Sequence, residues 1–553
     1  MSQFHMLKKK IDEKEALFQI LMQEEIKEKN PPLGISKASR SQYVPLSYAQ
    51  KRLYILSELI PDKSVYNITT ALRFQGKLRI DLLKQSFNDL ISRHEILRTS
   101  FILHDDQPIQ TIHPPFDIKL NIIDLKESQH NREEIANFIE QEQNKLFHLD
   151  ILPLFRVTIL KCSEDDHILL FTIHHIISDG WSMGILINEL SSFYTGYHSQ
   201  QKTDLQPLPV QYVDYAIWQN EKIQKNEWEY QLQYWKKQLQ NLSPMDFPVD
   251  FRRSISHDYS ASIVYFTIDE KLKKQLIKIT SECHVSLFII LLTGYFLLLC
   301  RCTGHEKIAV GIPVANRKNK EIESLIGYFV NTLVIVVDCE MQNKISTIIQ
   351  QIQEKTIDAL NNQDIPFDKI VEEMQPEREK DLQLFFQTMF AYQNTPRGKF
   401  FLPDLMISQI QSEKTKAKYD FLITIEENED ELKGIFEYNI NLFQKTRINR
   451  MIDMLLGIYQ SFIENINQTV AEIDLIKKDE KQKIVEKWNP DYQPIQFQSI
   501  LLLFQYRCNR NPNTIAIQDG NQSITYEELN KNANRIAHAL RQRGLAYGSR
   551  IAI

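Results

Sequence analysis

Apolar residues along the chain recur either in short unbroken runs or at the spacings of one face of a helix. The run HILLFTI at 167–173 is rich in apolar and β-branched residues and predicts a buried strand. The stretch that begins at Trp181 places Ile185, Leu186 and Leu190 at helical spacings, which predicts a helix. We therefore expect a turn from strand to helix between these two segments.

The same alternation of extended and helical patterns continues in both directions. LSYAQKRLYILSEL at 46–59 predicts a helix, ALRFQGKL at 71–78 a strand, and LLKQSFNDLISRHEIL at 82–97 another helix. A break rich in proline and mixed charge, SPMDFPVDFRRS, precedes a second alternating stretch from about residue 260 to 475. The pattern predicts a mixed α/β (α+β) protein with two lobes, residues 43–225 and 226–480.

The two ends of the chain have different patterns. Residues 1–42 predict an amphipathic helix and a polar linker, either a solvated lead-in helix or a docking helix for an upstream partner. Residues 481–553 predict a linker, a short strand, a turn at Asp519-Gly520, a helix from Thr525 to Arg543 and a last strand, RIAI. We expect this last segment to be the beginning of a further domain.

Composition narrows the class of protein. With 553 residues, of which 43% are hydrophobic and 25% charged, the chain predicts several globular units in a soluble protein. Its net charge of -6 comes from 65 basic and 71 acidic residues that are well mixed, so we expect no nucleic-acid partner. The N-terminus lacks the apolar region of an export signal, and the six cysteines are scattered, which favours the cytoplasm.

The most apolar segment, LFIILLTGYFLLLC at 287–300, is shorter than the roughly 20 residues that cross a membrane. It predicts a buried helix, and we expect no membrane association. Nearby, Cys300, Cys302 and His305 lack a second pair of ligands for zinc and are interpreted as core residues.

IHHIISDGW at 173–181 carries the chemistry of the expected turn. Side chains alternate along a strand, so His174 and His175 are expected to point in opposite directions. A metal ion would need both histidines on one face of the strand as ligands. Because alternation separates them, we expect no metal site. Two interpretations of the histidines remain: they are packed in the interior, or one of them is a catalytic base. Asp179 is interpreted as the cap of the following helix or as a charged anchor, and Gly180, which has no Cβ, allows unusual backbone angles or the close approach of a ligand.

HHIISDG resembles the HHxxxDG motif of the condensation domains of nonribosomal peptide synthetases. The companion motifs of that family follow in order between about residues 43 and 475. They are LSYAQKRLYIL, RHEILRTSF, YVDYAIW, GIPVANR, IGYFVNTL and NQDIPFDKIV. In this family a run of arginine, serine and proline precedes the sequence PLFQ. The corresponding segment here, EREKDLQLFFQTMF, departs from that pattern. ITYEELNKNANRIAHALRQRGLAYGSRIAI near the end is similar to the start of an adenylation domain.

The resemblance implies two chloramphenicol-acetyltransferase-like lobes in a V-shaped pseudo-dimer with a channel between them. It implies amide-bond formation between a carrier-bound acyl or peptidyl thioester and a carrier-bound aminoacyl acceptor, and the first motif favours an L-residue donor. The implied partners are an upstream donor carrier protein, a downstream acceptor carrier protein and an adenylation domain of the same module. Phosphopantetheine arms of the carriers would tether the substrates. A starter domain for a fatty acyl donor and a non-catalytic platform that recruits carrier proteins stay as alternatives.

His175 is expected to be the base, with His174 supporting the turn. An α-amine with a pKa near 7.7–8.0 is already about a tenth neutral at pH 7, so deprotonating it accounts for about 1.4 kcal/mol. A general base typically contributes about 10²- to 10⁴-fold. We therefore expect the larger share to come from positioning the amine and from relieving positive charge on the tetrahedral adduct.

The remaining candidates are structural or border the channel. Asp179 is expected to bridge to an arginine of the second lobe, Arg317, and Gly180 to keep the donor tunnel open. A further set is assigned to the channel or to structural support: Trp181, Ser182, Asn331, Tyr48 and Arg98.

Overall fold

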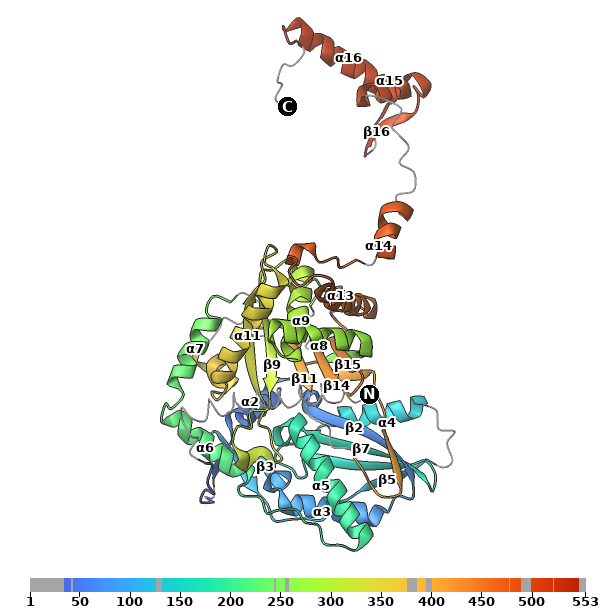
Figure 1. Cartoon of the computed structure of the whole chain (residues 1–553). Helices are drawn as coiled ribbons and strands as arrows, with labels where there is room; N and C mark the ends of the chain where they lie inside the picture. Colours follow the sequence, from blue (N-terminus) through green and yellow to red (C-terminus); the bar gives the residue numbers. More distant parts are fainter. Residues whose placement is uncertain are drawn as a thin grey trace. The chain divides into compact units, whose positions relative to one another are not determined.

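The computed structural model divides into two compact units, Met1–Leu475 and Ile476–Ile553. It describes residues 34–40, 43–125, 132–242, 245–253, 258–374, 385–393, 400–476, 478–488, 499–520 and 522–546. The predicted N-terminal helix and the predicted last strand lie outside these residues. The two units are described in turn (Figure 1).

A five-stranded sheet organises the first part of the first unit. Its strands lie in the order β12-β2-β7-β6-β5, and only β5 and β6 are parallel. Their bounds are β2 (Asn67–Gly76), β5 (Asn121–Asp124), β6 (Phe155–Lys161), β7 (Asp166–His174) and β12 (Leu405–Gln409). Although β12 comes from the segment assigned to the second lobe, it pairs with β2 at the edge of this sheet.

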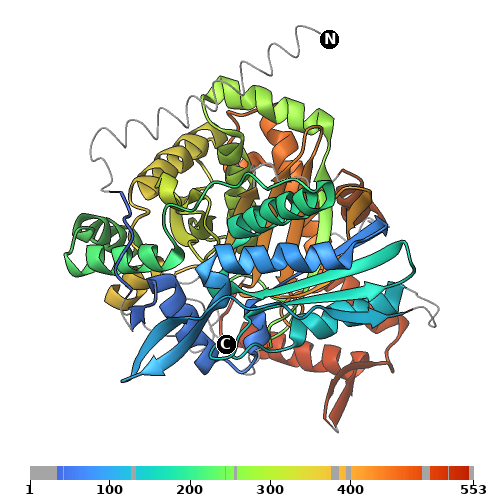
Figure 2. The ribbon, with the colours of Figure 1, turned by 90° about the horizontal axis from the view of Figure 1, so that it is seen from below.

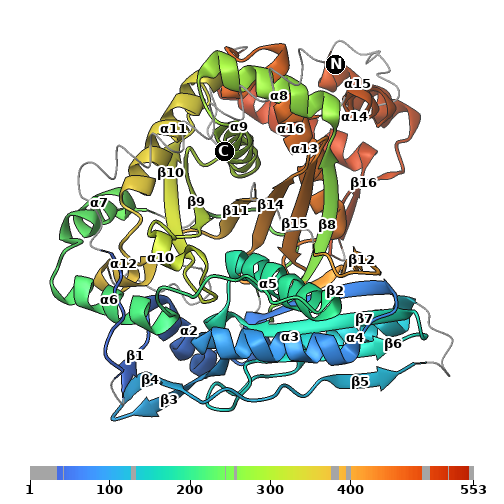
Figure 3. The ribbon, with the colours of Figure 1, turned by 60° about the horizontal axis from the view of Figure 1, so that its bottom comes forward.

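Strand β7 is buried on both faces, which explains its unbroken apolar run. Helices α3 (Ile80–Arg93) and α5 (Gly180–Ser199) lie side by side and share a core with Phe171 and Ile173 (Figures 2 and 3). Ile168 and Leu170 belong to a separate core on the other face, together with residues of α4 (Arg132–Asn144). The buried strand and the helix after it are therefore confirmed.

A small sheet in the order β1-β4-β3, the two helices α2 and α6 and three 3₁₀ turns complete the description of this part. The bounds are β1 (Val44–Pro45), α2 (Tyr48–Leu59), β3 (Thr99–His104), β4 (Gln107–Ile112) and α6 (Tyr212–Gln224), with 3₁₀ turns at Lys63–Tyr66, Glu95–Arg98 and His175–Ile177.

A seven-stranded sheet organises the second part of this unit, in the order β10-β9-β11-β14-β15-β8-β13. The pairs β9–β11 and β11–β14 are parallel and the others antiparallel. The strands are β8 (Ser260–Ile268), β9 (Lys307–Val314), β10 (Asn331–Asp338), β11 (Thr388–Gln393), β13 (Lys414–Lys416), β14 (Phe421–Glu427) and β15 (Leu432–Asn439). The helices are α7 (Glu229–Leu239), α8 (Glu270–Cys283), α9 (Leu287–Thr303), α10 (Lys320–Glu323), α11 (Ile345–Asn361), α12 (Phe367–Met374) and α13 (Lys445–Glu464), with a 3₁₀ turn at Val470–Glu472.

Helix α9 is the centre of the second core and contains the most apolar segment of the sequence. Ile289 through Cys300 are all buried among residues of the sheet and of α11 and α13, so the predicted buried helix is confirmed. Among the described residues, no single helix has both the length and the apolar composition needed to cross a membrane. Helices α8 and α9 meet that criterion only as a pair, and the pair is bent by 102°.

The second unit contains α14 (Lys478–Gln482), a π-helical turn at Lys483–Lys487, α15 (Ile500–Arg510), β16 (Ile515–Asp519), β17 (Gln522–Thr525) and α16 (Tyr526–Gln542). Gly520 has a φ of +55° between the two antiparallel strands, as the predicted turn requires. Thr525 and Glu528 form a capping box at the start of α16, which agrees with the predicted helix. Both units mix helices with sheets, and the predicted α/β class is confirmed.

Candidate functional site

The turn between β7 and α5 holds the two histidines. His174 is the last residue of β7, the 3₁₀ turn His175–Ile177 follows, and α5 begins at Gly180. Asp179 caps this helix, since its Oδ1 accepts a hydrogen bond of 2.8 Å from the backbone N–H of Ser182. The predicted strand-to-helix turn is therefore present.

His174 is packed in the interior. It is 2% exposed, and its ring lies 6.2 Å from that of Tyr66 and 6.1 Å from that of Phe147. Its Nδ1 accepts a hydrogen bond of 3.1 Å from the N–H of Ile176. Burial, aided by the charge of Lys418, lowers the pKa of His174 to about 3, so the ring is neutral and supports the turn.

His175 is half-buried and its hydrogen bonding defines which nitrogen can accept a proton. Its Nδ1 lies 2.9 Å from the carbonyl oxygen of Ser178. Because a carbonyl oxygen can only accept, Nδ1 carries the proton and Nε2 carries the lone pair. Burial, and next the charge of Lys418, hold the pKa of His175 well below its usual value. The residue is therefore a neutral imidazole whose Nε2 has no hydrogen bond to any residue in the described ranges.

Strand alternation alone does not explain why the two histidines have different surroundings. Only His174 belongs to β7, whereas His175 starts the 3₁₀ turn and is oriented by the Ser178 carbonyl. The two rings have different neighbours, Tyr66 and Phe147 for His174 and Tyr328 for His175, and the turn, rather than the strand, orients the second ring.

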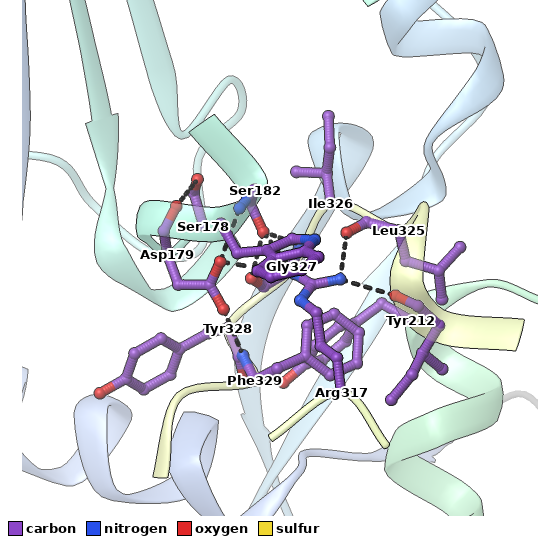
Figure 4. Close-up of polar contacts among 12 residues, drawn as sticks. Ser178, Asp179, Ser182, Tyr212, Arg317, Leu325, Ile326, Gly327, Tyr328 and Phe329 are labelled. Atoms are coloured by element: carbon purple, nitrogen blue, oxygen red, sulfur yellow. Dashed lines mark hydrogen bonds and ion pairs between the residues drawn. The ribbon is translucent and has the colours of Figure 1, made fainter. Parts of the chain in front are cut away.

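Asp179 and Arg317 form the ion pair expected from the sequence. The Arg317 Nη2 lies 3.4 Å from Asp179 Oδ1 and donates a hydrogen bond of 2.8 Å to Ser182 Oγ (Figure 4). Its Nη1 donates to the carbonyl oxygens of Ile322, at 2.6 Å, and Leu325, at 2.7 Å. Arg317 lies just after β9, so the pair joins the turn before α5 to the second sheet.

The three residues that follow Asp179 in sequence have different surroundings. Ser182 is fully buried, and its hydroxyl forms hydrogen bonds with both the N–H and the carbonyl of Gly327, which are structural contacts. Trp181 is 38% exposed and its Nε1 donates to the carbonyl of Glu323 at 3.0 Å. A Cβ added to Gly180 would meet no atom within 4 Å, which places open space beside it.

Two tyrosines were not singled out from the sequence, although they lie in the motif segments YVDYAIW and IGYFVNTL. Tyr212 Oη donates a hydrogen bond of 2.6 Å to the carbonyl of Tyr328. The ring of Tyr328 lies 5.2 Å from that of His175, edge to face. Nothing in the local pattern indicated this pairing, because the two segments lie more than a hundred residues apart.

The other candidates have structural contacts. Asn331 holds the segment before α12, donating to the carbonyls of Gln363 and Ile365 and accepting from the N–H of Phe367. Arg98 donates to the carbonyl of His113 at 2.5 Å. Tyr48 begins α2, and its N–H donates to Gln219 Oε1 at 2.9 Å. None of these hydrogen bonds joins Asn331, Arg98 or Tyr48 to His175.

Charged groups also lie near the histidines. Lys418 Nζ lies 5.0 Å from the centre of the Tyr66 ring, which itself contacts His174. Burial lowers the pKa of Lys418 to about 8 and raises that of Glu437 to about 7, and each residue's charge opposes the shift of the other. Across the described part of the chain, no group of three or more His, Cys, Asp or Glu could hold a metal ion.

Comparison with known families gives two matches within the chain. Residues 40–485 match the model of the condensation domain, and residues 504–553 match that of AMP-binding enzymes. Malpinin synthetase of Mortierella alpina is 33% identical over 528 residues, which is 95% of this chain and 7% of that protein. Bacitracin synthase 3 of Bacillus licheniformis is 32% identical over 528 residues, 95% of this chain and 8% of that protein. The chain therefore spans less than a tenth of the length of these two relatives.

Solved structures share the fold. The X-domain from teicoplanin biosynthesis superposes with a TM-score of 0.74 at 21% identity and covers 80% of this chain and 100% of its own. A four-domain nonribosomal peptide synthetase crystallised with AMP and glycine superposes with a TM-score of 0.73 at 21% identity, over 94% of this chain and 40% of its own.

Proposed function

The chain belongs to the condensation-domain family, and from that premise we propose that it forms an amide bond between two carrier-bound thioester substrates. The donor is an acyl or peptidyl thioester and the acceptor an aminoacyl thioester, each tethered by the phosphopantetheine arm of a carrier protein. The match of residues 504–553 to AMP-binding enzymes supports an adenylation domain of the same module as a partner.

The observation that carries the proposal is the hydrogen bond between Nδ1 of His175 and the carbonyl oxygen of Ser178. The Ser178 carbonyl fixes the proton on Nδ1, and Nε2 is left as the acceptor. Since its pKa lies well below the usual value, the imidazole is neutral near pH 7 and its Nε2 is unprotonated. The same shift makes it a weaker base than an ordinary histidine, so the proton that it takes must come from a strongly acidic group, such as the positively charged nitrogen of the tetrahedral adduct.

The proposed reaction conserves atoms and charge. The acceptor amine attacks the donor carbonyl, the N–C bond forms, and one proton on the nitrogen passes to Nε2 of His175. The C–S bond breaks, and the same proton can pass from the imidazolium to the leaving sulfur, which gives an amide and a thiol. Gly180 contributes the open space beside this turn, and its N–H at the start of α5 can polarise a carbonyl oxygen.

The test uses the full chain with carrier proteins loaded with acetyl, octanoyl or phenylalanyl donors and with alanyl or leucyl acceptors. Mass spectrometry measures amide formation by the wild type, by His175→Ala and by the control variant His198→Ala, which changes a half-exposed histidine at the far end of α5. We expect His175→Ala to lower the rate by about 10²- to 10⁴-fold and His198→Ala to leave it unchanged.

Other results identify the alternatives. Product from the octanoyl donor alone would favour a starter domain. Carrier binding without amide formation from any pair would favour a recruitment platform and contradict the proposal. Equal rates for the wild type and His175→Ala would contradict the role of the base.

A further inference from the structure

The segment Leu325–Phe329, between α10 and β10, is held by side chains rather than by pairing with a strand. Each of its five residues has a backbone group bound by a side chain from elsewhere. These hydrogen bonds are Arg317 Nη1 to Leu325 O (2.7 Å), Ile326 N to His94 Nδ1 (3.5 Å), Gly327 N to Ser182 Oγ (3.0 Å), Tyr212 Oη to Tyr328 O (2.6 Å) and Phe329 N to Asp179 Oδ2 (3.0 Å). The backbone of this segment is therefore fixed along its whole length.

Packing fixes the same segment. Leu325, Ile326 and Phe329 are each 1% exposed, and the Phe329 ring lies 4.0 Å from the Arg317 guanidinium. Gly327 lies so close to Tyr212 that an added Cβ would be 1.9 Å from a ring carbon. Buried side chains and a close backbone contact leave the segment no room to shift.

Tyr328 differs from its neighbours because its side chain alone in the segment is partly exposed. In Figure 4 its ring extends away from the polar cluster around Arg317. It lies edge to face with His175 at 5.2 Å. An aromatic side chain on a fixed backbone thus stands beside the imidazole of His175.

This arrangement limits what can lie next to the base. An amine must come within about 2.6–3.2 Å of Nε2 to transfer its proton. The carbon that bears the amine is then one bond further away, and its side chain occupies the space around His175. In the adduct both the acceptor α-carbon and the donor carbonyl carbon are bonded to this nitrogen, but the acceptor side chain starts two bonds from the nitrogen and the side chain of a donor residue starts three bonds away. Of the two side chains, that of the acceptor is therefore the nearer to His175 and to the Tyr328 ring beside it.

We propose that Tyr328 is a specificity-determining residue that sets the largest side chain accepted on the aminoacyl acceptor. This inference rests on the proposed function, since it assumes that an amine is bound at His175. A smaller residue at position 328 should admit bulkier acceptors while the base is unchanged.

The test measures the rate of amide formation by the full chain with one carrier-bound donor, the one most active with the wild type. The acceptors are a graded series of carrier-bound aminoacyl thioesters carrying alanine, valine, leucine, phenylalanine or tryptophan. The variants are Tyr328→Ala, Tyr328→Leu and Tyr328→Phe, with Tyr230→Ala on α7 as a control at an exposed tyrosine. Thermal unfolding verifies that each variant is folded. If Tyr328→Ala does not fold, Tyr328→Leu takes its place as the test variant.

We expect Tyr328→Ala to raise the ratio of the tryptophan rate to the alanine rate by about tenfold or more. Tyr328→Leu should raise it less, and Tyr328→Phe and Tyr230→Ala should leave it unchanged. An unchanged ratio in folded Tyr328→Ala would overturn the inference, as would a change in donor preference without a change in acceptor preference. Absence of any His175-dependent product with the wild type would instead show that the proposed function has failed, and the inference with it.

Discussion

Asp179 and Arg317 meet as a buried ion pair, with Oδ1 and Nη2 3.4 Å apart although 138 positions separate the residues in sequence. Their side chains are 0% and 2% exposed. Asp179 also accepts hydrogen bonds from the N–H groups of Ser182 and Phe329. One carboxylate therefore caps the helix behind the base and fixes the segment that carries Tyr328.

Asp179→Asn should destabilise the chain strongly. The two carboxylate oxygens accept from three donors, and an amide would leave at least one donor facing its NH₂ group and the guanidinium without a counter-charge. Breaking a buried pair in this way typically costs about 3–5 kcal/mol of unfolding free energy. Urea unfolding of the full chain measures the loss.

The control for this change is Asp166→Asn, which breaks the more exposed pair with Arg73. Exposed pairs contribute about 0–1 kcal/mol, so this variant should unfold nearly as the wild type does. Equal stabilities for Asp179→Asn and the wild type would show that the buried pair does not anchor the turn.

Gly180→Leu should lower activity without lowering stability. A Cβ at Gly180 meets nothing within 4 Å, and the residue begins α5, so the leucine can be accommodated by the fold. Its side chain would fill the open space in which we place the substrate. We expect amide formation to fall by at least about tenfold, since filling a site with a few methylene groups has effects of that order.

Gly184→Leu is the matched control, because it lies one turn further along α5 and its Cβ also meets nothing within 4 Å. The rate of amide formation should be close to that of the wild type. If Gly180→Leu formed amide as fast as Gly184→Leu, the substrate would have to bind elsewhere.

The local pattern of apolar residues predicted secondary structure that depends on which faces of a strand or helix are buried. The run 167–173 indicated a buried strand, which the structure covers on both faces, and the spacing after Trp181 indicated the helix that the structure forms as α5. Both predictions succeed because side-chain periodicity follows directly from which faces are covered. The resemblance to a known family supplied the pairing of Asp179 with Arg317, which no local pattern contains.

The sequence could not predict contacts made by the backbone of irregular segments. Ser182 was assigned to a channel or to structural support, and it is in fact buried against Gly327. The tautomer of His175 depends on the carbonyl of Ser178, and the place of Tyr328 depends on side chains that are distant in sequence, Tyr212 and Asp179 among them. Such contacts depend on the tertiary arrangement. Neither the spacing of apolar residues nor the types of residue present predicts them.

His174→Asn should make stability less dependent on pH in the acid range. Burial holds the pKa of His174 at about 3, against an ordinary value of about 6.5 in the unfolded chain. The unfolded state therefore binds the proton first, and the stability that this ring contributes is complete above about pH 6.5 and falls as the pH drops toward 3. From this residue alone the loss is about 1.4 kcal/mol per pH unit, or about 2 kcal/mol at pH 5.

Asparagine does not titrate, and its Oδ1 can still accept the hydrogen bond from Ile176 that Nδ1 accepts now. Urea unfolding at pH 8, 7, 6 and 5 should give a shallower decline for His174→Asn than for the wild type. His148→Asn, at an exposed histidine, should not change the slope. Parallel pH profiles for the wild type and His174→Asn would contradict the buried neutral state.

Gly327→Ala should disturb both the fold and the site, because the backbone of this residue lies directly on the ring of Tyr212. The added Cβ would be 1.9 Å from a ring carbon, well inside van der Waals contact, and Tyr212 is 1% exposed and cannot move away freely. Overpacking of this kind costs about 1–3 kcal/mol. Any relief must displace the backbone between Ile326 and Tyr328 and so move the Tyr328 ring relative to His175. We therefore expect lower stability in urea and an altered rate ratio between large and small acceptors.

The control is Gly457→Ala in α13, where an added Cβ meets nothing within 4 Å. This variant should neither lower the stability in urea nor alter the rate ratio. If Gly327→Ala lost stability but kept the acceptor preference of the wild type, the position of Tyr328 would not depend on this segment.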